Sequence, residues 1–110
     1  MMQTTPKSRE MRVQIPAGAQ REQVLEAVQH ATGDAGLFIS HIGGYSRTKY
    51  PGAVHWHFKR DKKEKGVLDA TYWADGPLFW LTLRNNEPQW VHDAAPRLQD
   101  AVAARIAKLS

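Results

Sequence analysis

The 110-residue sequence contains no cysteine, which excludes disulfide bonds, thiolate metal ligands and a cysteine nucleophile. It also lacks any apolar run close to the roughly 18 residues that span a bilayer. The polar segment Met1–Glu10 has no apolar middle region of the kind found in secretory signals. Together these absences predict a soluble, cytoplasmic protein with no membrane partner.

Motifs that bind nucleotide phosphates are missing as well. Gly18 and the Gly43–Gly44 pair match neither the dinucleotide-binding fingerprint nor the phosphate-binding loop. We therefore expect no nucleotide cofactor, and nothing else in the sequence indicates a cofactor of another kind.

Positive charge is unevenly distributed along the chain. The formal net charge is +4, yet the segment 47–65 alone carries seven Lys or Arg and two acids, a net of +5. The remainder of the chain is therefore close to neutral, with a net charge of −1. Local basic charge of this kind is typical of a surface that binds an anionic partner.

Alternating hydrophobicity predicts the first strand. Met11, Val13 and Ile15 alternate with polar residues over positions 10–15, which is the period of a half-buried strand. Residues 1–9 show no periodicity and are predicted to form a flexible arm. Residues 10–110 are then expected to form a single domain.

Two helices are predicted. Residues 19–32 place apolar side chains at helical spacing, and Gly33 follows where a left-handed C-cap would lie. Near the C-terminus, Asp93 is the expected N-cap of a second helix, which would hold Pro96 in its first turn.

Three strand-like runs lie between the helices: Val54–Arg60, Val67–Trp73 and Leu78–Arg84. The pair Asp75–Gly76 predicts a type I′ turn between the last two runs. The earlier segment Asp34–Ile42 fits either a short strand or a half-turn, and a strand is favoured. The order β-α-(β)-β-β-β-α predicts an α+β two-layer sandwich, with a mainly antiparallel four- or five-stranded sheet and two helices on one face.

Laying the three runs side by side sorts their side chains onto two faces. One face is apolar in every row and is expected to form the core beneath the helices. The other face places His57 opposite Asp69 and His55 opposite Thr71. A shift of one residue would bury the polar set instead, so the apolar pattern fixes the register.

The polar face suggests a small enzyme as one alternative function. Asp69 could hold the tautomer of His57 so that this imidazole acts as a general base, and Thr82 could hydrogen-bond to the same carboxylate. Arg84 or Lys59 could then bind an anionic substrate group. Cross-strand contacts of this type are also common as solvated sheet pairs, so no catalytic residue is assigned.

Metal binding is a further hypothesis for the same face. His55 and His57 lie two residues apart and point the same way, and Asp69 adds a carboxylate. A lone His-x-His pattern is a weak signal for a metal site, so none is predicted.

The favoured function is a non-catalytic binding module for nucleic acid or another polyanion. Lysine and arginine would contact phosphates, and tryptophans on the sheet would stack on bases. The alternative is an interaction module that binds another protein or a second copy of itself through the same face, with the tryptophans as anchors. The residues predicted to bind are Tyr45, Arg47, Lys49, Tyr50, His55, Lys59, Lys62, Lys63, Trp73, Trp80 and Arg84.

Overall fold

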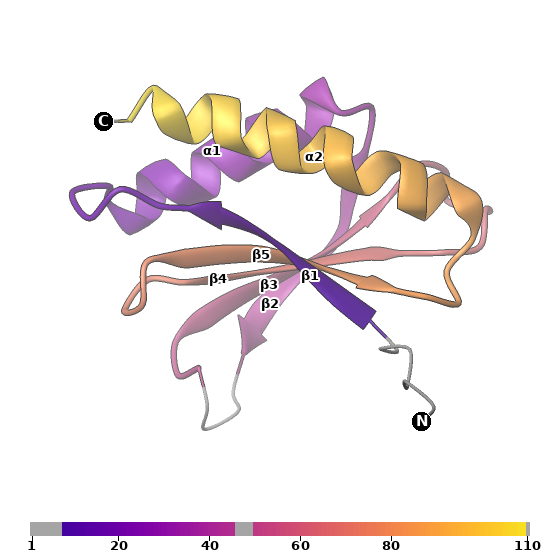
Figure 1. Ribbon diagram of the computed structural model, residues 1–110, viewed down its shortest axis with the longest axis horizontal. Coiled ribbons are helices and arrows are strands. Elements are labelled where there is room, and N and C mark those ends of the chain that lie inside the picture. The colour runs from indigo at the N-terminus through magenta and orange to yellow at the C-terminus, as the bar shows by residue number, and fades with distance from the viewer. Residues whose placement is uncertain (1–7, 46–49, 110) are drawn as a thin grey trace, which may run out of the picture.

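A computed structural model describes residues 8–45 and 50–109 of the chain (Figure 1). This part of the chain forms five strands and two helices in the order β-α-β-β-β-β-α. The elements are β1 (Ser8–Gln14), α1 (Arg21–Asp34), β2 (Phe38–Tyr45), β3 (Ala53–Lys59), β4 (Leu68–Trp73), β5 (Leu78–Arg84) and α2 (Gln89–Ala107).

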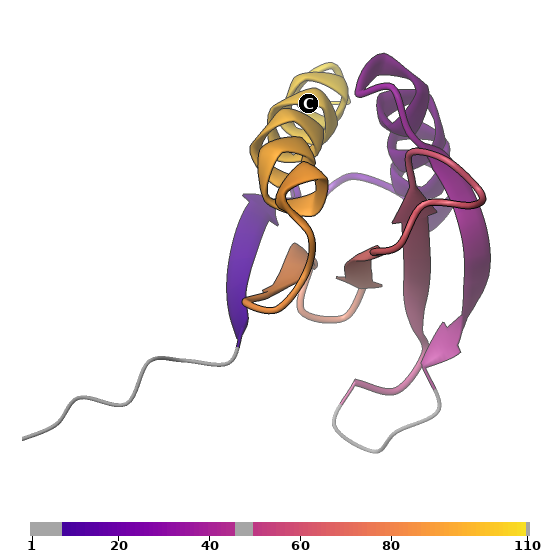
Figure 2. The same ribbon diagram turned by 90° about the vertical axis from the view of Figure 1, so that its right-hand side faces the viewer.

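The strands form one antiparallel sheet in the order β1-β5-β4-β3-β2. Helix α1 carries the chain from β1 at one edge to β2 at the other, and the meander from β2 to β5 returns across the sheet. Figure 2 shows the two helices side by side over one face of the sheet. The predicted α+β sandwich is confirmed, and the segment with two possible structures does form a strand.

The predicted register of the meander is also confirmed. His57 lies opposite Asp69 and His55 lies opposite Thr71 in the β3–β4 ladder. On the other side of β4, Asp69 is paired with Thr82 of β5. Because side chains alternate along a strand, this register places the polar residues of all three strands on the face away from the helices.

The apolar face of the meander forms the core. Burying each large side chain there contributes on the order of 1.5 to 3 kcal/mol, so a slipped register would be strongly disfavoured. All nine members of the three apolar rows are at most 5% exposed: Val54, Trp56, Phe58, Leu68, Ala70, Tyr72, Phe79, Leu81 and Leu83.

Helix α1 ends later than predicted. It continues through Gly33 to Asp34, and the left-handed backbone angle (φ +74°) occurs at Gly36 instead. The prediction of Gly33 as the C-cap is therefore wrong. A tertiary contact accompanies the longer helix, because Arg105 of α2 binds the Asp34 carboxylate with Nε 2.9 Å from Oδ2.

Helix α2 begins earlier than predicted. It starts at Gln89, so Asp93 lies inside the helix rather than at its N-cap, and Pro96 lies in the interior rather than in the first turn. Packing sets the start of this helix, because Trp90 is buried and its Nε1 donates to the carbonyl oxygen of Lys65 at 2.7 Å. No local sequence pattern reports that distant contact.

The β4–β5 link is not the predicted type I′ turn. Neither Asp75 nor Gly76 has a positive φ angle, and the last ladder pair joins Trp73 to Leu78, which leaves four residues in the link. Gly76 is required for another reason. A Cβ atom there would lie 2.4 Å from the Trp73 ring, so only glycine leaves room for that indole.

The N-terminal strand is longer than predicted. It begins at Ser8, so Ser8 and Arg9 belong to the sheet rather than to an arm, and residues 1–7 lie outside the described part of the chain. Within residues 8–45 and 50–109, neither helix combines the length and the apolar character that a membrane span requires.

Candidate functional site

A pocket of about 480 Å³ lies on the sheet face that carries no helix. Its lining comes from four neighbouring strands, β1, β5, β4 and β3, and from Tyr50, which precedes β3. We call it the polar-face pocket, and it is lined by Glu10, Tyr50, His55, Asp69, Thr71, Trp80, Thr82 and Arg84.

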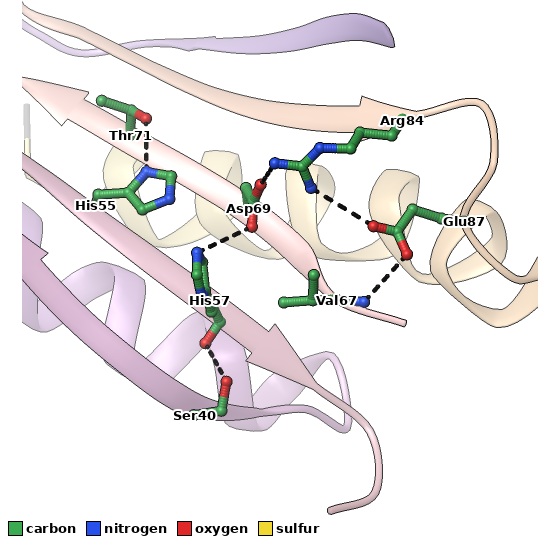
Figure 3. Close-up of polar contacts among 8 residues, drawn as sticks. All are labelled: Ser40, His55, His57, Val67, Asp69, Thr71, Arg84 and Glu87. Carbon is green, nitrogen blue, oxygen red and sulfur yellow. Dashed lines mark hydrogen bonds and ion pairs between the residues drawn. The ribbon is translucent and has the colours of Figure 1, made fainter. Parts of the chain in front are cut away.

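Asp69 lies at the centre of this face on the middle strand β4. Its side chain is only 2% exposed, although the sequence pattern places it on the face away from the core. Figure 3 shows Arg84 and His57 on either side of it, with Arg84 Nη2 2.5 Å from Oδ2 and His57 Nε2 3.4 Å from Oδ1. Among the described residues, Oδ1 accepts no hydrogen bond.

Arg84 connects this carboxylate to the end of the sheet. Its Nη1 lies 3.5 Å from Oε2 of Glu87, and Oε1 of Glu87 accepts a hydrogen bond of 3.4 Å from the backbone nitrogen of Val67 (Figure 3). The guanidinium therefore lies between two carboxylates. It balances charge within the site and is not positioned as a free clamp for an anionic substrate group.

Three histidines lie in a row across β2 and β3. The ring centroids of His55 and His57 are 5.0 Å apart, and those of His57 and His41 are 5.3 Å apart. His41 could not be placed beside them from the sequence alone, because the register of β2 against β3 was not predicted. The structure pairs it directly with His57.

The imidazole of His55 is half-buried. Its Nδ1 lies 3.2 Å from Oγ1 of Thr71 (Figure 3). Burial lowers the pKa of His55 below its ordinary value of 6.5, and the charges of His57, His41 and Arg84 act in the same direction against the opposing effect of Asp69. The neutral imidazole, which is the form that can bind a metal ion, is therefore favoured.

The aromatic residues of this face cover one another. The Tyr50 ring packs on Trp73 and Trp80, with centroid distances of 5.3 and 5.0 Å. Trp80 is only 8% exposed, because the Tyr50 ring covers it. Both Tyr50 and Trp80 line the polar-face pocket.

Among the described residues, Arg84 is the one arginine or lysine that lines the pocket; the described lysines that were predicted to bind lie outside the lining. Lys62, Lys63 and Lys65 are exposed in the β3–β4 loop, whereas Nζ of Lys59 donates to the backbone oxygen of Glu64 at 2.8 Å. Arg47 and Lys49 lie outside the described residues, as does the side chain of Tyr45 at the end of β2.

The structure thus places most of the predicted site residues that it describes in two groups, while His57 contacts Asp69 and Trp73 contacts Tyr50 without lining the pocket. One group lines the polar-face pocket: Tyr50, His55, Asp69, Trp80, Thr82 and Arg84. The lysines of the β3–β4 loop form a separate group beyond the far end of β3. Glu10 joins the pocket unexpectedly, because β1 pairs with β5 and sets Glu10 opposite Thr82. The pairing partner of the first strand was not predicted from the sequence.

The fold and the site together define a five-stranded antiparallel α+β sandwich with a polar pocket on the face opposite its helices. A scan against models of protein families, a search of the curated proteins and a search of the solved structures each found no match to this chain.

Proposed function

We propose that this chain is a small binding module for nucleic acid, in which an unpaired base enters the polar-face pocket and the backbone follows β3 toward the basic loop. The observation that carries this proposal is the combination of an aromatic wall and a polar floor within one pocket. Its volume of about 480 Å³ falls within the range of about 300 to 1,000 Å³ that is common for small-ligand sites.

The pocket offers the contacts that a flipped-out base uses. Tyr50 provides ring surface and is itself backed by Trp80, and base stacking on such a ring tolerates any sequence. Thr71 and Thr82 can donate or accept hydrogen bonds, and Asp69 can accept them from the amino groups of a base. A base is thus a better match for the pocket than a bare phosphate, because the carboxylates of Asp69 and Glu10 would repel an anion.

Phosphate contacts would come from the adjacent loops. The exposed Lys62 and Lys63 follow the end of β3, and Lys59 lies four positions after His55 on that strand, or roughly 14 Å away at the rise of an extended chain. Lys49 directly precedes Tyr50 in the sequence. A single strand of a few nucleotides could therefore contact lysines at one end and place a base in the pocket at the other.

Binding of a labelled, unstructured oligonucleotide at several salt concentrations tests this proposal. Each lost phosphate contact should reduce the slope of log affinity against log salt by about 0.7, so Lys62→Ala with Lys63→Ala should reduce it by about 1.4. Tyr50→Ala should instead weaken binding by about 1 to 3 kcal/mol with the slope unchanged. Tyr50→Phe, which keeps the ring, should bind almost as well as the unaltered chain.

Lys108→Ala serves as the charge control, because Lys108 follows α2 in the helical layer on the opposite side of the sheet. It should leave both affinity and slope unchanged. Absence of binding at low salt would refute the proposal, as would equal effects of the loop lysines and Lys108.

Homodimerisation is the second candidate, and the exposed side chain of Ile42 favours it. Ile42 is 54% exposed on the edge strand β2, and an unpaired edge with an apolar side chain can pair with a second chain. The mass in solution should then rise with concentration, and Ile42→Lys should abolish the rise. A concentration-independent mass of one chain would exclude this candidate.

A further inference from the structure

We propose that His55, His57 and Asp69 bind one divalent transition-metal ion of the zinc class. One ring nitrogen of each histidine and one oxygen of Asp69 all lie within 4.8 Å of one another. Two ligands about 2.1 Å from a tetrahedral ion are roughly 3.4 Å apart. Small side-chain rotations would therefore bring the three atoms to bonding distance, with no change in the sheet register that holds them.

The strongest support is the unsatisfied carboxylate oxygen of Asp69. The side chain is 2% exposed, and among the described residues its Oδ1 accepts no hydrogen bond. A buried carboxylate oxygen without a partner is costly. Oδ1 faces Nε2 of His57 at 3.4 Å, so an ion between these two atoms would satisfy both.

The surrounding contacts orient the proposed ligands as outer contacts do in known metal sites. Arg84 contacts Oδ2 of Asp69, so the guanidinium leaves the other carboxylate oxygen, Oδ1, to the metal ion (Figure 3). Thr71 lies 3.2 Å from Nδ1 of His55. If that nitrogen donates its proton to the hydroxyl, the tautomer with its lone pair on Nε2 is fixed for metal binding.

The local charge also favours a cation. Asp69 and Glu10 line the pocket with Arg84, and Glu87 lies 3.5 Å from the same guanidinium. Arg12 adds a further positive charge beside Glu10 at 3.4 Å. When the histidines are neutral, these three carboxylates outnumber the two guanidiniums, so the group carries a net negative charge.

The ligand types identify the class of metal. Two imidazoles and one carboxylate suit zinc, cobalt, nickel or copper, whereas magnesium and calcium prefer oxygen ligands alone. Three protein ligands leave at least one coordination position free toward the pocket. This inference goes beyond the proposed nucleic-acid binding and is tested without any oligonucleotide.

Cobalt(II) is the probe, because its visible absorption reports coordination by nitrogen and oxygen ligands. The untagged chain should bind one Co²⁺ with a change in absorption, and Zn²⁺ should displace it. His57→Gln should weaken binding by more than about 100-fold, because loss of a direct ligand should exceed the roughly 10- to 100-fold effect of an outer contact. His55→Gln should behave in the same way, and both variants should keep the circular dichroism of the unaltered chain.

His30→Gln is the matched control, since His30 lies on α1 in the other layer and pairs with Glu26 at 3.6 Å. It should bind Co²⁺ like the unaltered chain. Thr71→Val should weaken Co²⁺ binding about tenfold if Thr71 positions His55. The proposal is overturned if the unaltered chain takes up no stoichiometric Co²⁺, or if His55→Gln and His57→Gln bind it as well as His30→Gln does.

Discussion

Replacing Arg84 with methionine should destabilise the fold by leaving the buried Asp69 carboxylate without its cation. Two unit charges about 4 Å apart attract by about 4 kcal/mol at an effective dielectric constant of about 20. The Arg84 side chain is 47% exposed while Asp69 is 2% exposed, so solvent screens one partner only. We therefore expect a loss of about 2 kcal/mol, between the values for exposed and fully buried pairs.

Urea denaturation followed by circular dichroism measures this loss directly. For a chain of this length, 2 kcal/mol corresponds to a fall in Tm of roughly 8 to 10 °C. The control is Arg105→Met, which breaks the exposed pair with Asp34 (Nε to Oδ2 2.9 Å). That change should destabilise the fold much less, because both of its partners are solvated.

A double-mutant cycle separates the effect on Asp69 from the effect on Glu87, which also contacts Arg84. In an Asp69→Asn background there is no buried carboxylate to leave uncompensated, so Arg84→Met should cost at least about 1 kcal/mol less than in the unaltered chain. Equal losses in the two backgrounds would refute the reasoning, since they would mean that Arg84 does not balance the charge of Asp69.

Three other changes test the fold and the site. His55→Gln, measured with a chelator present, should reduce the loss of stability that the unaltered chain shows below pH 6.5. Burial lowers the pKa of His55 in the folded chain, so the unfolded chain takes up the proton first. The unaltered chain therefore loses stability as the pH falls from 6.5 toward the folded pKa. A pH profile parallel to that of the unaltered chain would contradict this. Gly66→Ala should lower the free energy of unfolding by at least about 1 to 2 kcal/mol, because φ is +106° and a Cβ atom would lie 2.8 Å from Pro88. An unchanged midpoint of urea denaturation would contradict the positive φ angle and the close contact at Gly66. Phe58→Ala should lower the free energy of unfolding by about 3 to 5 kcal/mol, since the side chain is fully buried. A loss below about 1 kcal/mol would show that the core around Phe58 is not tightly packed.

The register of the meander was predicted correctly because the alternating apolar patterns of its three strands agree with one another. Apolar residues alternate on β3, β4 and β5, and only one register puts all of them on the same face. That register alone brought His57 opposite Asp69. Local patterns were sufficient here because adjacent strands are also consecutive in sequence.

The parts that were missed depend on contacts between distant segments. The pairing of β1 with β5 brings Glu10 into the pocket, and Tyr50 covers Trp80 from a link between strands. The start of α2 is likewise set by the contact of Trp90 with Lys65, 25 residues earlier in the chain. Neither periodicity nor capping preference carries information about such pairings.

The central position of β4 has a consequence for how the chain opens in solution. Alternate residues of this strand serve the core and the polar face, and β3 and β5 pair with it on both sides. Its amide hydrogens should therefore exchange with solvent only through global unfolding, as expected for the most protected strand of a sheet. A ligand bound by Asp69 and Thr71 would consequently slow the amide hydrogen exchange of the whole sheet rather than that of one loop.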